Sequence, residues 1–152
     1  MIKLPIKIES HSSEDTERIG RDFCKYLLEK GEGNAFIAMY GDLGAGKTAF
    51  ARGLASHLVP DASVCSPTYT IVNEYRGGGK ILCHFDMYRI ESEDDLYSIG
   101  FFDYENCMMA VEWCEKIPFA LPEHRYELTI TKNGENSRLI TIDEKHSKDV
   151  QK

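Results

Sequence analysis

The octapeptide Gly41-Asp42-Leu43-Gly44-Ala45-Gly46-Lys47-Thr48 decides the fold of this chain, because it has the form GxxxxGK[ST]. In such a loop, backbone N–H groups surround the phosphates, the lysine reaches the β and γ oxygens, and the last hydroxyl binds Mg²⁺. Ala35–Tyr40 before it is an apolar run typical of a buried strand, and Thr48–Leu58 after it has apolar residues at helical spacing. Strand, glycine loop and helix N-terminus form a phosphate-binding unit. The sequence therefore predicts binding of a nucleoside triphosphate.

Size and charge narrow the class of nucleotide-binding protein. The 152 residues suffice for one domain, with no room for the second motor domain of a helicase or the lid and acceptor insertion of a nucleotide kinase. The net charge is −7, from 25 acidic and 18 basic residues, and no Lys/Arg cluster is present. Because a surface that holds nucleic acid by itself normally carries a basic patch, we expect any such binding to require a partner.

The five cysteines indicate a reducing environment. Their number is odd and none forms a CxxC pair. No signal peptide opens the chain, and no apolar run approaches the roughly 18 residues needed to span a membrane. We expect reduced, mostly buried thiols in a cytoplasmic protein.

The remaining segments predict an α/β domain. Met1–Glu9 alternates apolar and polar residues around a proline, as in an edge strand, and Ser12 or Ser13 caps a helix that ends near Gly31. Ser92-Glu93-Asp94-Asp95 opens a further short helix.

Two β-hairpins are expected, one from residues 71–75 and 81–87 and one from residues 126–131 and 138–143. The predicted fold is a single-domain P-loop NTPase, residues 1–143, with a mixed sheet whose parallel core strands are flanked by helices. Residues 144–152 are expected to form a polar tail.

Two acids end predicted strands and are candidates to complete the phosphate site. Residues 107–111 are uniformly apolar, as in a central parallel strand, and Glu112 follows them. Asp86 ends the return arm of a hairpin, so at least one pairing of its strand is antiparallel. Since ligands bind at the carboxyl ends of parallel strands, Glu112 is the stronger candidate to lie beside Thr48 and the metal, and Asp86 is the second acid that orients water. A solvated Glu112, or an ion pair of Asp86 with Arg89, is the alternative.

Residues 59–70 are expected to form a polar loop after the P-loop helix, and the segment Ser66-Pro67-Thr68-Tyr69-Thr70 within it is rich in hydroxyl groups. A γ-phosphate sensor lies at such a position, although an ordinary Ser/Thr turn has the same composition. Trp113 adjoins Glu112, where it either reports on the nucleotide, faces a partner or packs half-buried.

These blocks together resemble the TsaE (YjeE) family of small bacterial P-loop ATPases. Four segments occur in the order found in that family: the P-loop, residues 66–70, His84-Phe85-Asp86-Met87-Tyr88-Arg89 and Val111-Glu112-Trp113. Gly100-Phe101-Phe102-Asp103-Tyr104 lies between the last two. The resemblance covers roughly residues 10 to 143. Ala49 stands where the family often has Thr or Ser, and Cys114 where proline is common.

The resemblance implies an ATPase needed to make threonylcarbamoyladenosine beside the tRNA anticodon, acting on a complex of TsaB and TsaD. It implies Thr48 and Glu112 as Mg²⁺ ligands, with Asp86 as the second acid, and Lys47 as the phosphate clamp. The ATP-binding residues expected are Asp42, Leu43, Gly44, Ala45, Gly46, Lys47, Thr48 and Ala49. Glu14 and Thr16 of the first helix, and the late hairpin near Asn133 to Arg138 with Asn136, are expected on the adenine side. The switch and partner residues expected are Ser66, Thr68, Tyr69, Thr70, Arg89 and Trp113.

Other functions remain as alternatives. A small-molecule kinase would need an acceptor pocket and a lid with several arginines, and the chain has no such insertion. A nucleotide-gated binding module needs no hydrolysis at all. The Asn-Lys-x-Asp signature of guanine recognition is missing, so GTP is disfavoured.

Overall fold

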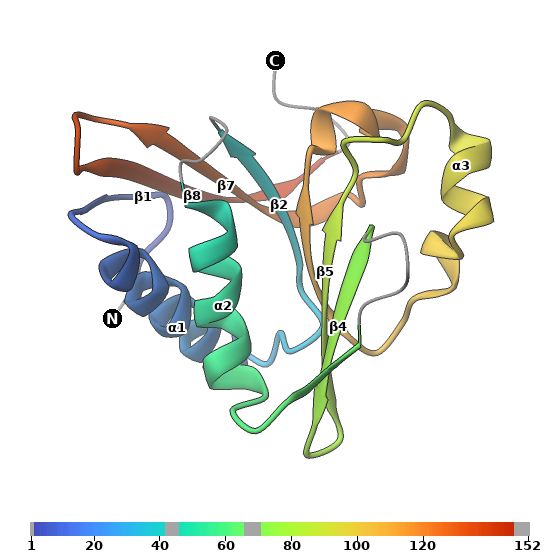
Figure 1. The fold of residues 1–152 in the computed structure, drawn as a ribbon, viewed down its shortest axis with the longest axis horizontal. Coiled ribbons are helices and arrows are strands. Elements are labelled where there is room, and N and C mark those ends of the chain that lie inside the picture. Colours follow the sequence, from blue (N-terminus) through green and yellow to red (C-terminus); the bar gives the residue numbers. More distant parts are fainter. Residues whose placement is uncertain (1, 42–45, 66–70, 148–152) are drawn as a thin grey trace.

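The structure is a computed structural model that describes residues 2–41, 46–65 and 71–147, with the side chains of 63–65 excepted. One sheet runs through the molecule in the strand order β1-β8-β7-β2-β6-β5-β4-β3 (Figure 1). The four central strands β7, β2, β6 and β5 are parallel, and the outer pairings are antiparallel. The strands are β1 (Ile6–Ser10), β2 (Phe36–Gly41), β3 (Ser63–Cys65), β4 (Val72–Gly77), β5 (Lys80–Asp86), β6 (Met108–Glu112), β7 (His124–Lys132) and β8 (Arg138–His146).

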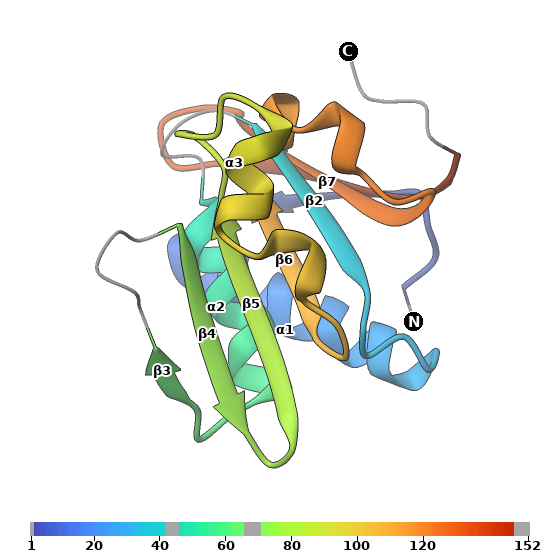
Figure 2. The ribbon, with the colours of Figure 1, turned by 90° about the vertical axis from the view of Figure 1, so that its right-hand side faces the viewer.

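Helices cover both faces of this sheet (Figures 1 and 2). α1 (Ser13–Glu29) and α2 (Lys47–Leu58) pack against one face, and α3 (Glu93–Ser98) against the other. Short 3₁₀ helices follow at η1 (Phe101–Asp103), η2 (Cys114–Lys116) and η3 (Pro118–Ala120). Alternate residues of the central strands enter two cores: Ile37 and Met39 of β2 face the α1–α2 side, whereas Ala38 and Tyr40 face α3.

The two helices on the first face touch through glycines. A Cβ on Gly53 of α2 would lie 2.0 Å from the backbone oxygen of Glu17, and one on Gly20 of α1 would lie 2.3 Å from the oxygen of Phe50. Only glycine permits this close crossing. The contact holds α2, and with it the end of the P-loop, at a fixed position over β2.

The predicted α/β class, parallel core and hairpins are confirmed by these pairings. Residues 108–112 form a parallel strand between β2 and β5, and Ile6–Ser10 is an edge strand against β8. The N-cap of α1 is Ser12, whose hydroxyl accepts from the N–H of Asp15 at 2.9 Å. Gly31 and Gly100, both with positive φ, follow the ends of α1 and α3.

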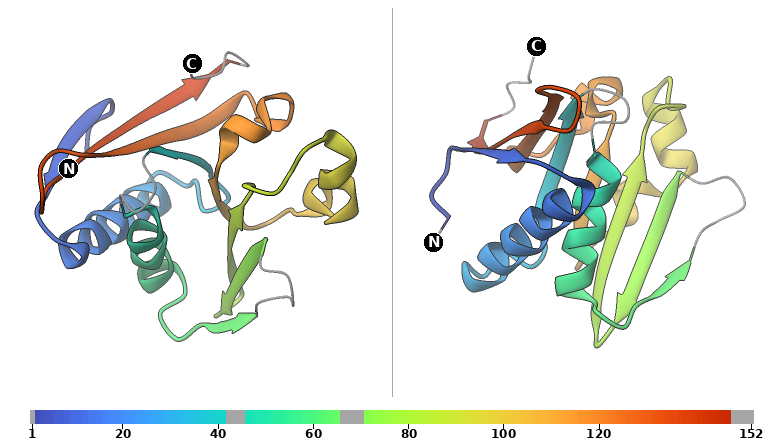
Figure 3. Two further views of the ribbon diagram at one scale, coloured as in Figure 1. Left: turned by 45° about the horizontal axis from the view of Figure 1, so that its top comes forward. Right: turned by 60° about the vertical axis from the view of Figure 1, so that its left-hand side comes forward.

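Two sequence expectations were wrong. Residues 63–65 were expected in a loop but form β3, because a three-residue strand is too short to show a period. The polar tail was expected from residue 144, yet β8 extends to His146. Figure 3 shows β8 in red beside β7 in orange. Polar partners explain this extension, because Lys30 and His124 hold the Glu144 carboxylate.

The four cysteines whose side chains are described, Cys24, Cys83, Cys107 and Cys114, are free and buried. Burial raises the pKa of the Cys24 thiol to about 11, so this group is protonated and unreactive at neutral pH. Among the described residues, no helix is long and apolar enough to cross a membrane.

Candidate functional site at the carboxyl edge of the parallel strands

The two flanks of the P-loop lie at the carboxyl end of the central strand β2. Gly41 ends β2 with a φ of 132°, and a Cβ there would lie 2.0 Å from the backbone oxygen of Ile130 in β7. Gly46 precedes α2 with a φ of 113°. Both positions therefore require glycine, as the motif does. Asp42, Leu43, Gly44 and Ala45 lie outside the described residues.

Lys47 is the first residue of α2, and its ammonium group lies inside the site. Its Nζ donates to the backbone oxygen of Gly41 at 3.0 Å and lies 5.4 Å from the centre of the Trp113 ring. The residue is only 6% exposed. Among the described residues no carboxylate pairs with this buried ammonium, and a cation held by a carbonyl and a ring face is suited to an incoming anion.

Asp86 and Glu112 end adjacent parallel strands and are partners in the register of β5 and β6. The N–H of Met87 donates to the backbone oxygen of Glu112 at 3.1 Å, which ties the two strand ends together. The sequence had favoured Glu112 because β5 returns from a hairpin. The structure corrects this reasoning, since β5 also pairs in parallel with β6, and both acids stand at the ligand-binding edge.

The two acids differ in their surroundings. Asp86 is exposed and accepts the N–H of Tyr88 at 3.0 Å. The side chain of Glu112 is 12% exposed, and its Oε2 lies 2.5 Å from Nε2 of His84. His84 lies two residues before Asp86 on the same face of β5, which is the face covered by α1 and α2. Glu112 is thus a buried, oriented carboxylate, and the alternative of a solvated acid does not hold.

The donor types at this edge fit a magnesium–triphosphate group. Asp86 and Glu112 supply carboxylate oxygens, and Thr48 is exposed on the first turn of α2, where its hydroxyl is available. Oxygen donors are the ligands Mg²⁺ prefers, and it is usually held by one or two carboxylates together with substrate phosphates. The side chain of Ala49 is buried, so only the backbone of this residue is available to a ligand.

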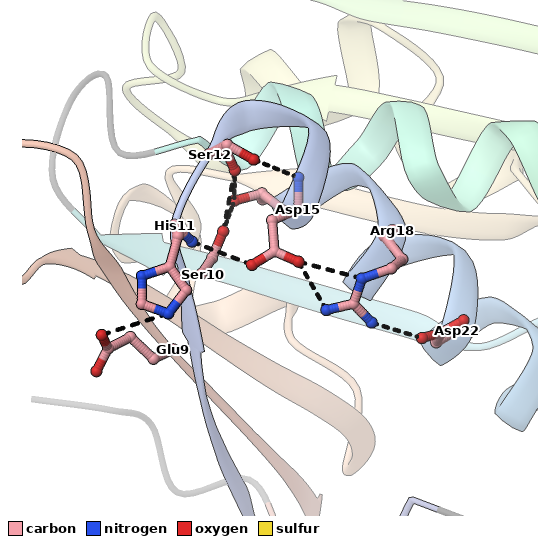
Figure 4. A network of polar contacts seen from close by, with 8 residues as sticks. Glu9, Ser10, His11, Ser12, Asp15, Arg18 and Asp22 are labelled. Atoms are coloured by element: carbon pink, nitrogen blue, oxygen red, sulfur yellow. Dashed lines mark hydrogen bonds and ion pairs between the residues drawn. The ribbon is translucent and has the colours of Figure 1, made fainter.

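A cavity of about 320 Å³ lies beside Gly46, next to the P-loop. Thr16 and Asn136, predicted on the adenine side, both line it, whereas Glu14 does not and is exposed. Oγ1 of Thr16 lies 2.7 Å from Oγ of Ser10 and donates to the backbone oxygen of Ser12. In the same network, Asp15 accepts from Arg18 and from the N–H of His11 (Figure 4). The cavity is lined by His11, Ser12, Ser13, Thr16, Gly46, Glu135, Asn136 and Arg138.

The predicted switch and partner residues fall into two groups. Ser66, Thr68, Tyr69 and Thr70 lie outside the described residues. Trp113 is half-buried with a φ of 61°, a left-handed conformation that is uncommon for a large residue, and it packs edge-on against Tyr88 at 5.0 Å. Arg89 is exposed, and no ion pair joins it to Asp86 within the described part of the chain, so the alternative of a structural Asp86–Arg89 pair does not hold.

Comparison with known proteins agrees with this arrangement. Residues 10–140 match the family model described as "Threonylcarbamoyl adenosine biosynthesis protein TsaE". The chain belongs to the TsaE family. The tRNA threonylcarbamoyladenosine biosynthesis protein TsaE of Haemophilus influenzae is 40% identical over 109 residues, which are 70% of this chain and 69% of that protein. The protein of the same name from Bacillus subtilis is 38% identical over 70% of this chain and 67% of its own length.

A solved structure supports the same assignment. The crystal structure of Bacillus subtilis YdiB superposes with a TM-score of 0.70 at 29% identity, covering 97% of this chain and 88% of that one. The TsaE fold therefore extends over nearly the whole chain, including β1 and the β7–β8 hairpin that lie outside the motif-bearing strands.

The sequence of this TsaE-family chain assigned no role to two residues of the site. His84 lies within an apolar strand, and its signals were its period-2 spacing from Asp86 and its place in the family block of residues 84–89. His11 lines the cavity beside Gly46 together with Arg138, more than a hundred residues away, so no local pattern connects the two.

Proposed function

We propose that this TsaE-family protein binds Mg²⁺–ATP at the carboxyl edge of β2, β5 and β6 and hydrolyses it in support of threonylcarbamoyladenosine formation on tRNA. The observation that carries the proposal is the buried Glu112 carboxylate beside Asp86, on the strand next to the one that leads into the P-loop. A site for binding alone would not need two acids at this edge, whereas hydrolysis needs one group for the metal and one for water.

Each residue has a distinct role in this mechanism. Lys47 leaves the Gly41 carbonyl and binds the β and γ oxygens, while Thr48 and Glu112 hold the magnesium ion. When bound, the ion neutralises charge that develops on the transferred phosphoryl group. Asp86 is exposed, accepts a hydrogen bond from the Tyr88 N–H with one oxygen, and orients a water molecule with the other. The cavity lined by Thr16 and Asn136 accepts the adenine side of the nucleotide.

We further propose that the protein acts on a complex of TsaB and TsaD and reaches tRNA only through it. The acidic net charge of −7 supports an indirect role, because contact with phosphates requires basic surface. Hydrolysis by the protein alone is expected to be slow, and the partner complex is expected to change its rate.

Mass analysis of tRNA nucleosides tests the pathway assignment. Cells depleted of the protein are expected to lose threonylcarbamoyladenosine and to regain it with the wild-type gene but not with Glu112→Ala. Unchanged threonylcarbamoyladenosine after depletion would refute the role in this pathway. Full rescue by Glu112→Ala, if that variant still binds ATP, would favour nucleotide gating over hydrolysis. A phosphorylated product in place of free phosphate would favour a kinase.

A further inference from the structure

A group of metal-ligand side chains lies at the opposite end of the β7–β8 ladder from the Lys132–Arg138 turn. His124 begins β7 and His146 ends β8, and the two are directly paired in the antiparallel register. Their imidazole rings stack with centroids 4.8 Å apart and an interplanar angle of 5°. Glu144 is two residues before His146 and therefore projects from the same face of the sheet. The ladder thus brings two imidazoles and a carboxylate together.

The polar atoms of these side chains converge. Oε2 of Glu144 lies 2.7 Å from Nε2 of His124 and 3.4 Å from Nε2 of His146. Oε1 of Glu32, in the turn between α1 and β2, lies 3.4 Å from the same Nε2 of His124. The ligand atoms of His124, Glu144 and His146 all lie within 4.8 Å of one another.

We infer that His124, His146, Glu144 and Glu32 form a binding site for a divalent transition-metal ion of the zinc type. Two imidazoles and one or two carboxylates are a donor set that suits Zn²⁺ and its neighbours rather than Mg²⁺ or Ca²⁺. A tetrahedral ion with bonds of about 2.0 to 2.1 Å separates its ligand atoms by about 3.3 Å. The separations of 2.7 and 3.4 Å from Glu144 to the two imidazoles, and of 3.4 Å from Glu32 to His124, lie near that value. The two rings are stacked within 5° of parallel, so they must rotate to direct both Nε2 atoms at one ion.

Neighbouring side chains orient the two carboxylates. Lys30 Nζ donates to Oε1 of Glu144 at 2.8 Å, which leaves Oε2 directed at the imidazoles. The Tyr126 hydroxyl donates to Oε2 of Glu32, which leaves Oε1 directed at His124. In metal centres, side chains that bind the second polar atom of a ligand hold that ligand in the orientation needed for the metal. The Lys30 hydrogen bond also lowers the pKa of Glu144, which favours its ionised form.

The site is accessible and joins segments distant in sequence. His124 and His146 have side-chain exposures of 46% and 70%, whereas Glu144 and Glu32 are 19% and 22% exposed. A cavity of about 350 Å³ lined by His124, Glu32 and the neighbouring turn leaves room for a water ligand. A bound ion would connect the α1–β2 turn to the ends of β7 and β8, so it is expected to stabilise the fold.

Titration of the chelator-treated protein with Zn²⁺ tests the inference, and millimolar Mg²⁺ is included to compete with Zn²⁺ for the acids of the proposed P-loop metal site. Calorimetry is expected to give one Zn²⁺ per chain. The Tm is expected to rise by about 5 to 10 °C when Zn²⁺ exceeds its Kd one hundredfold. Co²⁺ is expected to give the visible absorption of a tetrahedral complex.

Substitutions distinguish Zn²⁺ binding at this site from Zn²⁺ binding by other side chains. His146→Ala and Glu32→Gln change partly or largely exposed groups, and each is expected to weaken Zn²⁺ binding by more than about tenfold, because a lost ligand costs at least as much as a lost outer partner. His57→Ala, at the end of α2, is the matched control and is expected to bind as the wild type does. Undiminished binding in both His146→Ala and His124→Ala, or no binding by the wild type at micromolar Zn²⁺, would overturn the inference.

Discussion

His84 is expected to position Glu112 for metal binding, and its replacement tests this. Its Nε2 lies 2.5 Å from Oε2 of a carboxylate whose side chain is only 12% exposed. A hydrogen bond to a charged buried group contributes about 1.5 to 3 kcal/mol. This hydrogen bond orients Glu112 toward the metal in our account. Its loss in His84→Ala is therefore expected to lower the Mg²⁺-dependent rate of ATP hydrolysis by roughly 10- to 100-fold, since 1.36 kcal/mol corresponds to a tenfold change in rate.

The matched variant is His84→Gln, whose amide nitrogen reaches the position of the imidazole Nε2. It keeps a donor to Glu112 and is expected to retain turnover within about threefold of the wild type. Turnover is measured by phosphate release over a range of Mg²⁺ concentrations. His84→Ala is expected to require more Mg²⁺ for half-maximal rate, which a merely structural role of His84 would not produce.

A loss of folding stability in His84→Ala must be distinguished from a loss of metal binding. Leaving Glu112 without its buried partner is expected to cost about 1 to 3 kcal/mol, which corresponds to a fall in Tm of about 2 to 10 °C. Assays well below the lower Tm therefore compare folded proteins. If His84→Ala hydrolyses ATP at the wild-type rate with the same Mg²⁺ dependence, the positioning role is refuted.

Three further predictions concern the helices and the tryptophan. Gly53→Ala places a Cβ 2.0 Å from the Glu17 oxygen and is expected to lower the free energy of unfolding, measured by urea denaturation, by about 2 kcal/mol or more. Gly77→Ala, whose Cβ would have its nearest neighbour at 3.7 Å, is the control. Equal stability of the two variants would contradict the close helix crossing. Arg18 lowers the pKa of Asp15, and because this ion pair is exposed to solvent, Asp15→Asn is expected to cost only about 0.5 kcal/mol at pH 7. Because a lowered pKa stabilises the fold only above the unfolded value near 4, that difference is expected to disappear as the pH falls through the folded pKa, and a pH-independent difference would count against it. The single tryptophan, Trp113, lies 5.4 Å from Lys47 Nζ, so its fluorescence is expected to change with Mg²⁺–ATP but not with adenosine, and identical responses to both ligands would contradict the Lys47 movement.

The sequence was sufficient to predict an element of structure where a single segment contains the whole pattern that identifies it. The apolar run before Glu112 predicted a central parallel strand, because a strand buried on both faces shows no alternation. Glycine-containing turns likewise predicted both hairpins. The P-loop predicted its own strand and helix, since the motif requires them.

Pairwise geometry could not be predicted in the same way. The contact of His84 with Glu112 depends on the relative register of β5 and β6, which no single segment encodes. β3 was missed for its shortness, and the last residues of β8 were expected in a tail because Glu144 finds its partners Lys30 and His124 in distant segments, just after α1 and at the start of β7. The cavity beside Gly46 joins Thr16 to Asn136 and was anticipated only through family resemblance.

The central claim is that the acids at the carboxyl edge make this P-loop protein a magnesium-dependent ATP hydrolase. Phosphate release by the purified protein, with and without Mg²⁺, tests it most directly when Glu112→Gln is measured beside the wild type. We expect slow release by the wild type that requires Mg²⁺, and release reduced to the uncatalysed background by Glu112→Gln although ATP still binds. Equal release by the two proteins, or release that continues without Mg²⁺, would contradict the account.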